Sequence, residues 1–198
     1  MMTAMRHRLN RISAASKMFG TFLRDRKGTG AVEFAIIAPL LIMTYIGSFE
    51  LSVGFNVARK VARASSTVAD IVTQQTEVSK AFLDSMKDVA AGVMTPYGVN
   101  YSMKITGIKV TAVGVGLVMW SRDEKGKVPY NVGSIIAIPA ELSTLNSFVV
   151  RTELALPHEL LLFAQGMSGH SLQTINLSKT YYYRQRIGEQ ITCVDCGV

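Results

Sequence analysis

The longest apolar segment of the chain lies near its amino end. Residues 34–49 contain no charged side chain, and the apolar character continues to Val57. About 24 residues of α-helix, at 1.5 Å per residue, extend roughly 36 Å, which is enough to cross a bilayer. The pattern therefore predicts one transmembrane helix over residues 29–57, with a single early acid, Glu33.

After this segment, hydrophobic residues recur at steps of three and four. The first series is Val57, Val61, Ala64, Val68 and Ile71, and the second is Val78, Phe82, Met86, Val89 and Val93. Such spacing forms one stripe of an α-helix. We expect the membrane helix to continue outward until residues 74–76, with Thr76 capping a second helix that ends before Pro96. Residues 58–98 are thus predicted to form a helical stalk.

From Tyr101 onward the hydrophobic period changes to two, which is typical of β-strands. The expected strands cover residues 101–112, 115–120, 148–156 and 175–183. The first changes phase at Gly107, as a β-bulge would, and Pro157 is expected to end the third. Charged residues 121–127 are expected to form a turn. Helices followed by strands predict an α+β fold, with a mostly antiparallel sheet in a domain over residues 99–198.

Positive charge is concentrated at the amino end. Of the net charge of +7, residues 1–28 carry +6, and residues 29–198 carry +1. Because Lys and Arg are retained on the cytoplasmic side of a membrane, we expect a cytoplasmic amino end facing anionic membrane lipid and a periplasmic domain. The near-neutral folded part does not favour nucleic-acid binding. The expected location is the inner membrane, spanned once, with the cell surface as a further site.

A short motif joins the basic leader (residues 1–28) to the apolar helix. It reads Arg24-Asp25-Arg26-Lys27-Gly28-Thr29-Gly30-Ala31-Val32-Glu33-Phe34. Followed by an apolar helix with Pro39, this motif resembles the processing site of a type IVb prepilin, and most closely that of the TadE family of tight-adherence pilus proteins. The resemblance implies that a prepilin peptidase cuts between Gly28 and Thr29. Lys27 and Phe34 belong to the same processing motif.

The resemblance implies a structural role and extends more loosely over most of residues 24–186. A pseudopilin or minor pilin would act in pilus assembly and adhesion, with other pilus subunits and inner-membrane assembly proteins as partners. Cleavage would create an α-ammonium at Thr29, which the Glu33 carboxylate of a neighbouring subunit is expected to neutralise. Three alternatives stay open: a plain signal anchor with an interfacial Glu33, a scaffold of the pilus secretion machinery that is never polymerised, and an anchored periplasmic protein with another role.

The remaining candidate chemistry is confined to Cys193 and Cys196, near the carboxyl end. In an oxidising periplasm these cysteines are expected to form a disulfide, with each other or with another chain. A zinc site would need two more ligands, for which His158 and His170 have an unusual spacing. We find no phosphate-binding glycine loop, nucleophile elbow or metalloprotease motif. We therefore expect no catalytic residues, no metal and no cofactor.

Overall fold

The structure is a computed structural model that describes residues 28–97, 100–159 and 174–196. The chain divides into two compact units, residues 1–48 and residues 49–198. Helix α2 (Thr29–Thr73) contributes its first turns to the first unit and its later turns to the second. We call residues 49–198 the folded unit. After α2 its elements are β1 (Glu77–Val78), α3 (Lys80–Met94), β2 (Ser102–Ala112), β3 (Val115–Asp123), β4 (Ile135–Ala137), the 3-10 helix η2 (Ala140–Leu142), β5 (Phe148–Glu159), β6 (Thr174–Arg184) and β7 (Thr192–Cys193).

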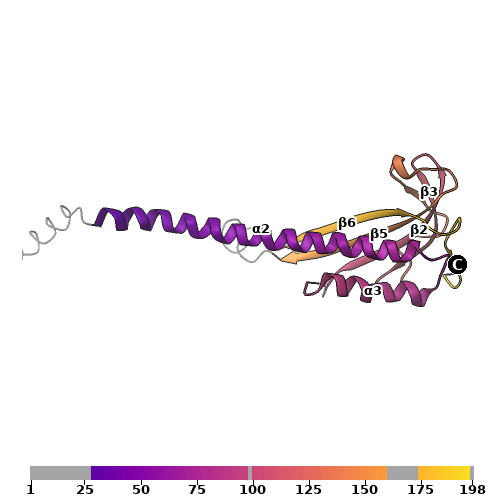
Figure 1. Ribbon diagram of the computed structural model, residues 1–198, viewed down its shortest axis with the longest axis horizontal. Helices are drawn as coiled ribbons and strands as arrows, with labels where there is room; N and C mark the ends of the chain where they lie inside the picture. Colours follow the sequence, from indigo (N-terminus) through magenta and orange to yellow (C-terminus); the bar gives the residue numbers. More distant parts are fainter. Residues whose placement is uncertain (1–27, 98–99, 160–173, 197–198) are drawn as a thin grey trace, which may run out of the picture. The chain divides into compact units, whose positions relative to one another are not determined.

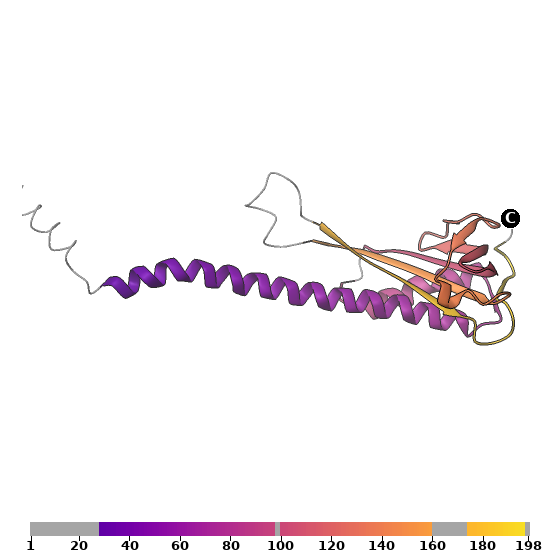
Figure 2. The same cartoon turned by 90° about the horizontal axis from the view of Figure 1, so that it is seen from above.

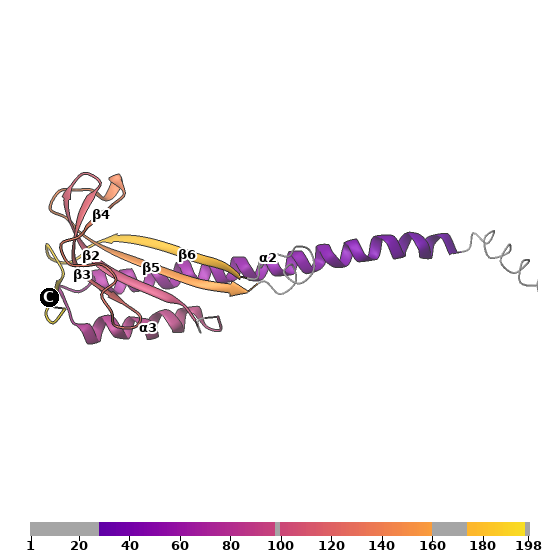
Figure 3. The ribbon, with the colours of Figure 1, turned by 180° about the vertical axis from the view of Figure 1, so that it is seen from behind.

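The folded unit has the α+β organisation that the sequence predicts. Five strands form one sheet in the order β4-β3-β2-β5-β6, and every neighbouring pair is antiparallel. The two short strands β1 and β7 pair separately, in parallel. Figure 1 shows α3 and the later turns of α2 beside the sheet, and Figure 3 shows β5 and β6 running together as a long hairpin.

Each face of the sheet contributes to a separate hydrophobic core. The inner face packs against both helices, through residues such as Val61 and Val68 of α2, Leu83 of α3 and Leu154 of β5. On the outer face, a smaller cluster gathers Ile108, Val110, Val118, Ile136, Ile138 and Val149. Figure 2 shows the β3–β4 end of the sheet and the carboxyl-terminal segment gathered at the same end of the folded unit.

The two helical stripes are confirmed, but the start of the second helix differs from the expectation. Helix α3 begins at Lys80, and its cap is Ser79, whose Oγ accepts a hydrogen bond from the Phe82 amide at 3.2 Å. The expected cap, Thr76, instead accepts a backbone hydrogen bond from Thr192. Val78 lies in β1 and is buried. The strand pairing with the carboxyl-terminal segment therefore displaces the helix start by one turn.

The strand predictions are confirmed in place, and Gly107 marks a shift of register between β2 and β3, as expected for a bulge. Strand β3 continues to Asp123, because Ser121, Arg122 and Asp123 pair with β2. The expected turn is therefore confined to the residues that follow Asp123, where the Gly126 amide donates to the Asp123 carbonyl.

The expectation that Pro157 ends its strand was wrong, because β5 runs on to Glu159. The Gln185 amide donates to the Phe148 carbonyl, so Val149 and Arg184 form a pair without direct backbone hydrogen bonds. Such pairs alternate along an antiparallel ladder, and Pro157 with Asn176 is another of them. The nitrogen of Pro157 therefore faces away from β6, toward the side of β2. Strand β2 does not reach Pro157, because its first residue, Ser102, pairs with Ala155. A proline at that position removes no ladder hydrogen bond.

Candidate functional site

The first candidate site is the amino-terminal part of α2, which exposes a continuous apolar surface. Phe34, Leu40 and Tyr45 are 67%, 66% and 75% exposed. This helix is long and apolar enough to cross a membrane, and the apolar window that qualifies it has no buried residue. Exposed side chains of this kind are stable in lipid and costly in water. We therefore describe this part of α2 as a membrane anchor.

The proposed cleavage junction lies at the start of this helix. Gly28 immediately precedes α2, and Thr29 is its first residue. A Cβ atom built on Gly28 meets no atom of the described residues within 4 Å. Glu33 follows Thr29 by four residues, so both lie on one face, and its side chain is exposed. Phe34 is exposed beside it. Lys27 and the residues before it lie outside the described residues.

A second carboxylate on α2 was not singled out from the sequence. Glu50 is only 8% exposed, and within the described part of the chain neither of its carboxylate oxygens has a hydrogen-bond partner. A buried carboxylate without a partner is costly to the stability of the fold. The available sequence signal was an acid that ends a run of 16 uncharged residues, 34–49.

The third candidate is the carboxyl-terminal strap, which we define as residues 191–196. Its strand β7 pairs in parallel with β1, and the Val194 amide donates to the Val78 carbonyl at 3.0 Å. Ile191 is 1% exposed, and its carbonyl accepts a hydrogen bond of 2.8 Å from Trp120 Nε1. The strap is therefore held by main-chain bonds to β1 and by the indole of Trp120, which lies on β3.

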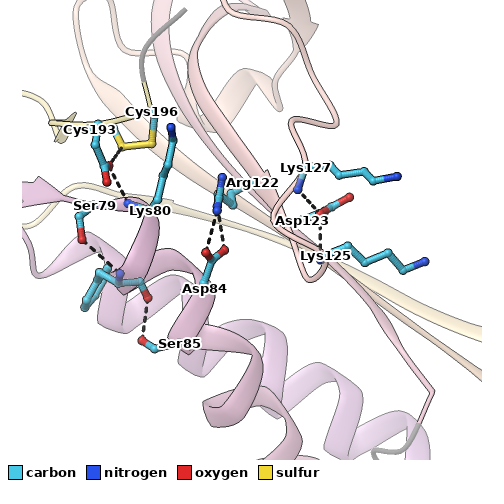
Figure 4. Close-up of polar contacts among 12 residues, drawn as sticks. Ser79, Lys80, Asp84, Ser85, Arg122, Asp123, Lys125, Lys127, Cys193 and Cys196 are labelled. Carbon is cyan, nitrogen blue, oxygen red and sulfur yellow. Dashed lines mark hydrogen bonds and ion pairs between the residues drawn. A yellow bond between two sulfur atoms is a disulfide. The ribbon is translucent and has the colours of Figure 1, made fainter.

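The strap also contacts the start of α3. Cys193 and Cys196 form a disulfide with Cα atoms 5.4 Å apart. Between them Asp195 accepts a hydrogen bond of 2.7 Å from the Lys80 amide, in the first turn of the helix. A carboxylate at a helix amino terminus is favoured by the unpaired amides and the helix dipole. Figure 4 shows the disulfide beside Ser79 and Lys80, with Asp84 one turn further along α3.

The same three side chains are the group of possible metal ligands in the described residues. The ligand atoms of Cys193, Asp195 and Cys196 lie within 4.8 Å of one another. In the disulfide both sulfurs are committed to each other, so only the Asp195 carboxylate retains its ligand character. His158 lies on β5 and belongs to no such group, and His170 lies outside the described residues.

One ion pair fixes α3 against the sheet next to the strap. Arg122 of β3 donates two hydrogen bonds of 2.7 Å to the two carboxylate oxygens of Asp84 (Figure 4). The bonds from Arg122 lower the pKa of the Asp84 carboxyl below its usual value. Bidentate geometry makes this pair more specific than an ordinary surface contact.

A polar and aromatic cluster covers part of the outer face of the sheet. Tyr130 donates a hydrogen bond of 2.8 Å to Glu153, which also pairs with Arg151 at 2.5 Å. The Arg151 guanidinium lies between the rings of Tyr130 and Tyr182, 5.3 and 5.9 Å from their centres. Burial raises the pKa of the Tyr130 hydroxyl, and the bond to Glu153 adds to this. These contacts attach the segment between β3 and β4 to β5 and β6.

A comparison with known families agrees with this arrangement, in which an exposed apolar helix follows a glycine and carries an early glutamate. Residues 28–70 match the family model of TadE-like proteins. The resemblance is thereby confirmed over this segment, which we call the TadE-like segment. No curated protein and no solved structure matches the chain.

The TadE-like segment begins at Gly28 and takes in almost all of α2, while the sheet lies outside it. It therefore contains Thr29, Glu33 and Glu50, but neither cysteine of the strap. Together with one helix able to span a bilayer, it indicates a pilus-associated protein with a single-pass membrane anchor.

If the strap lies outside the cytoplasm, its two cysteines stay oxidised. We predict that a maleimide added to the native protein without reductant labels neither Cys193 nor Cys196, and that labelling follows reduction. A cysteine at position 113, where Val113 is 73% exposed, provides a positive control in a variant lacking both native cysteines. Equal, immediate labelling of both native thiols would contradict the prediction and the orientation of the anchor.

Proposed function

We propose that this protein is a TadE-like pseudopilin or minor pilin of a tight-adherence pilus system. A prepilin peptidase removes residues 1–28, the anchor holds the protein in the inner membrane, and the folded unit lies in the periplasm or at the cell surface. Its partners are pilus subunits and inner-membrane assembly proteins. Its role is structural, and it catalyses no reaction.

One observation carries this proposal: the TadE-like segment begins at the glycine that precedes a charge-poor, exposed helix. A peptidase acting at the membrane face needs an accessible backbone, and Gly28 has no side chain and, among the described residues, no atom close to where a Cβ would lie. Glu33, one turn into the helix, supports the same interpretation. A lone carboxylate inside the membrane is costly unless it forms an ion pair with a cation. Cleavage after Gly28 creates such a cation, the α-ammonium of Thr29.

Amino-terminal sequencing of protein extracted from membranes tests the proposal. Mature protein is expected to begin at Thr29 in cells with an active prepilin peptidase. Gly28→Val is expected to abolish processing, because the added side chain prevents close approach of the backbone to the peptidase. Gly30→Ala is the matched control, since a Cβ at Gly30 also meets no atom within 4 Å.

This experiment, together with an assay of filaments sheared from the cells, separates the candidate functions. Residues 1–28 still attached in the parent protein would contradict the pilin proposal and favour a signal anchor. Processing without recovery of the mature protein in sheared filaments would favour the scaffold of the secretion machinery.

A further inference from the structure

The turns of α2 that follow the anchor are partly enclosed by protein. Glu50 is the first buried residue of the helix. Val57 belongs to the core on the inner face of the sheet together with Leu156 of β5, and Val53 packs against the same cluster. This stretch of α2 therefore packs against the sheet, so lipid cannot surround it.

The part of α2 without buried residues has the length of a bilayer. It covers residues 29–49, and these 21 residues of helix extend about 32 Å, close to the roughly 30 Å of a hydrocarbon core. The folded unit begins at Phe49, so no linker separates it from this stretch. A hydrocarbon core that ends at Phe49 rather than at Val57 places the start of the folded unit in the headgroup layer.

We call the end of the folded unit that adjoins the anchor its near end. It contains the first turns of α2 in the unit and the end of the β5–β6 hairpin, where Glu159 pairs with Thr174. Figures 1 and 2 both show this end of the hairpin directed back along α2, toward the amino end of the helix. Leu177 of β6 packs against the core, and Ile175 lies on the same face of the strand, nearer the hairpin end.

The near end exposes apolar side chains. Leu51 and Phe55 of α2 are 67% and 66% exposed, and Ile175 is 47% exposed. They continue the apolar surface of the anchor, where Phe49 is 58% exposed. Exposed side chains of this size are costly in water, whereas the boundary between headgroups and acyl chains accommodates them. The membrane-facing surface of the anchor thus extends onto the folded unit.

Arg59 supplies a positive charge at the same end. It is exposed and follows Phe55 by four residues, so both lie on one face of α2. Helical side chains lean toward the amino end, so that of Arg59 is directed toward the turn of Phe55. Arg59 belongs to none of the ion pairs of the described residues. The adjacent Lys60, by contrast, donates to the Thr95 carbonyl and lies over the Tyr97 ring.

We infer that the near end of the folded unit rests in the phospholipid headgroup layer, with Arg59 bound to lipid phosphate. Guanidinium groups bind phosphate through two parallel hydrogen bonds. Glu159, exposed at the same end, can meet the amine of phosphatidylethanolamine. Because the anchor holds these residues at the bilayer surface, lipid is the partner that they meet first. The contact would fix the orientation of the folded unit relative to the membrane.

Fluorescence quenching by nitroxide-labelled phospholipids measures the depth of the near end. A fluorophore is attached to Ile175→Cys in the full-length protein, in vesicles of phosphatidylethanolamine and phosphatidylglycerol. The native cysteines are joined in a disulfide, so the label reaches only the new thiol. A nitroxide on the headgroup is expected to quench the label about threefold more than one at the end of an acyl chain. Thr174→Cys, at an exposed neighbouring position, repeats the measurement independently.

Two further positions calibrate the depth. Leu41→Cys lies in the anchor, at a residue that is 57% exposed, and is expected to be quenched mainly by the acyl-chain nitroxide. Val113 is 73% exposed in the turn between β2 and β3. This turn lies at the end of β2 remote from Ser102, which pairs with β5 close to the near end. Val113→Cys is therefore expected to be quenched by neither nitroxide.

A matched pair of variants tests the phosphate contact. Arg59→Glu is expected to reduce headgroup quenching at position 175 about twofold, because the new carboxylate repels phosphate. Arg63→Glu is the control, since Arg63 is also exposed and without an ion pair among the described residues, but lies one turn further from the anchor. It is expected to leave quenching unchanged. Neither side chain belongs to the core, so both variants are expected to fold.

Four results would overturn the inference. Absence of quenching at positions 174 and 175 would place the folded unit clear of the membrane, and stronger quenching by the acyl-chain nitroxide would extend the hydrocarbon core beyond Phe49. Equal effects of the Arg59 and Arg63 variants would exclude the phosphate contact. Quenching that disappears as the ratio of protein to lipid rises would make a second copy the occupant. None of these results depends on cleavage after Gly28, so failure of the pilin proposal remains distinguishable.

Discussion

Gly107→Ala is expected to lower the free energy of unfolding of the folded unit by about 3 kcal/mol, near the upper end of overpacking effects. A Cβ atom at this position would lie 2.3 Å from Cε2 of Trp120 and 2.6 Å from Nε1. The indole cannot move away freely, because Nε1 donates to the Ile191 carbonyl and the ring packs in the core. Relief of the clash would therefore break the contact that holds the strap.

Denaturant unfolding of the purified protein in detergent measures this loss. Gly92→Ala in α3 is the matched control, because a Cβ there meets no atom within 4 Å. It should be neutral or stabilising by up to about 1 kcal/mol, since alanine favours a helix. The Gly107 variant should also lose less stability when Trp120 is replaced by leucine. Equal stability of the Gly107 and Gly92 variants would contradict the packing described for Trp120.

The second large effect is expected at Glu33, where glutamine should leave membrane insertion and processing intact but remove co-purification with pilus subunits. An unpaired carboxylate in the membrane costs about 2.5–3.5 kcal/mol on insertion scales. In the proposed assembly, the Thr29 ammonium of a neighbouring subunit removes that cost, so the charge itself drives docking. Glutamine keeps the shape and the polarity but cannot form the ion pair.

Glu50→Gln provides the control for Glu33→Gln. Both changes remove a carboxylate from α2, but Glu50 is buried, whereas Glu33 is exposed. Co-purification is expected to persist with the Glu50 variant. If the Glu33 variant assembles and supports adhesion like the parent protein, Glu33 is only an interfacial residue and the pairing mechanism is wrong.

Periodicity located the large elements because each buries one face. The stripe through Val61 and Val68 predicted the later turns of α2, and alternation predicted β5 and β6. Gly107 marked the register shift for the same reason: the side chains change face there. Local patterns of this kind are imposed by burial and can be read without the tertiary structure.

Other features depend on partners that are distant in sequence. In the sequence, the charge of Arg122 suggested a turn, because an unpaired charge is not expected in a strand that packs against a core. The position of Arg122 in β3 is explained by its ion pair with Asp84 of α3, which is distant in sequence. Strands β1, β4 and β7 have two or three residues each, too few for a periodic pattern. At the candidate site, the motif around Gly28 was recognisable as the start of the TadE-like segment. The contact of Asp195 with α3 and the burial of Glu50 required the fold.

The disulfide of the strap has a mechanical consequence if the carboxyl end is ever pulled, as it would be in a protein bound at the tip of a filament. Tension arriving at Cys196 has two routes to Cys193: the backbone through Val194 and Asp195, and the direct sulfur bridge. The bridge is covalent and limits how far the two Cα atoms can separate, so the intervening residues cannot be drawn out straight. Asp195 thus keeps its hold on the Lys80 amide under tension. The β1–β7 pair, which contains Cys193, would receive the tension directly from the bridge.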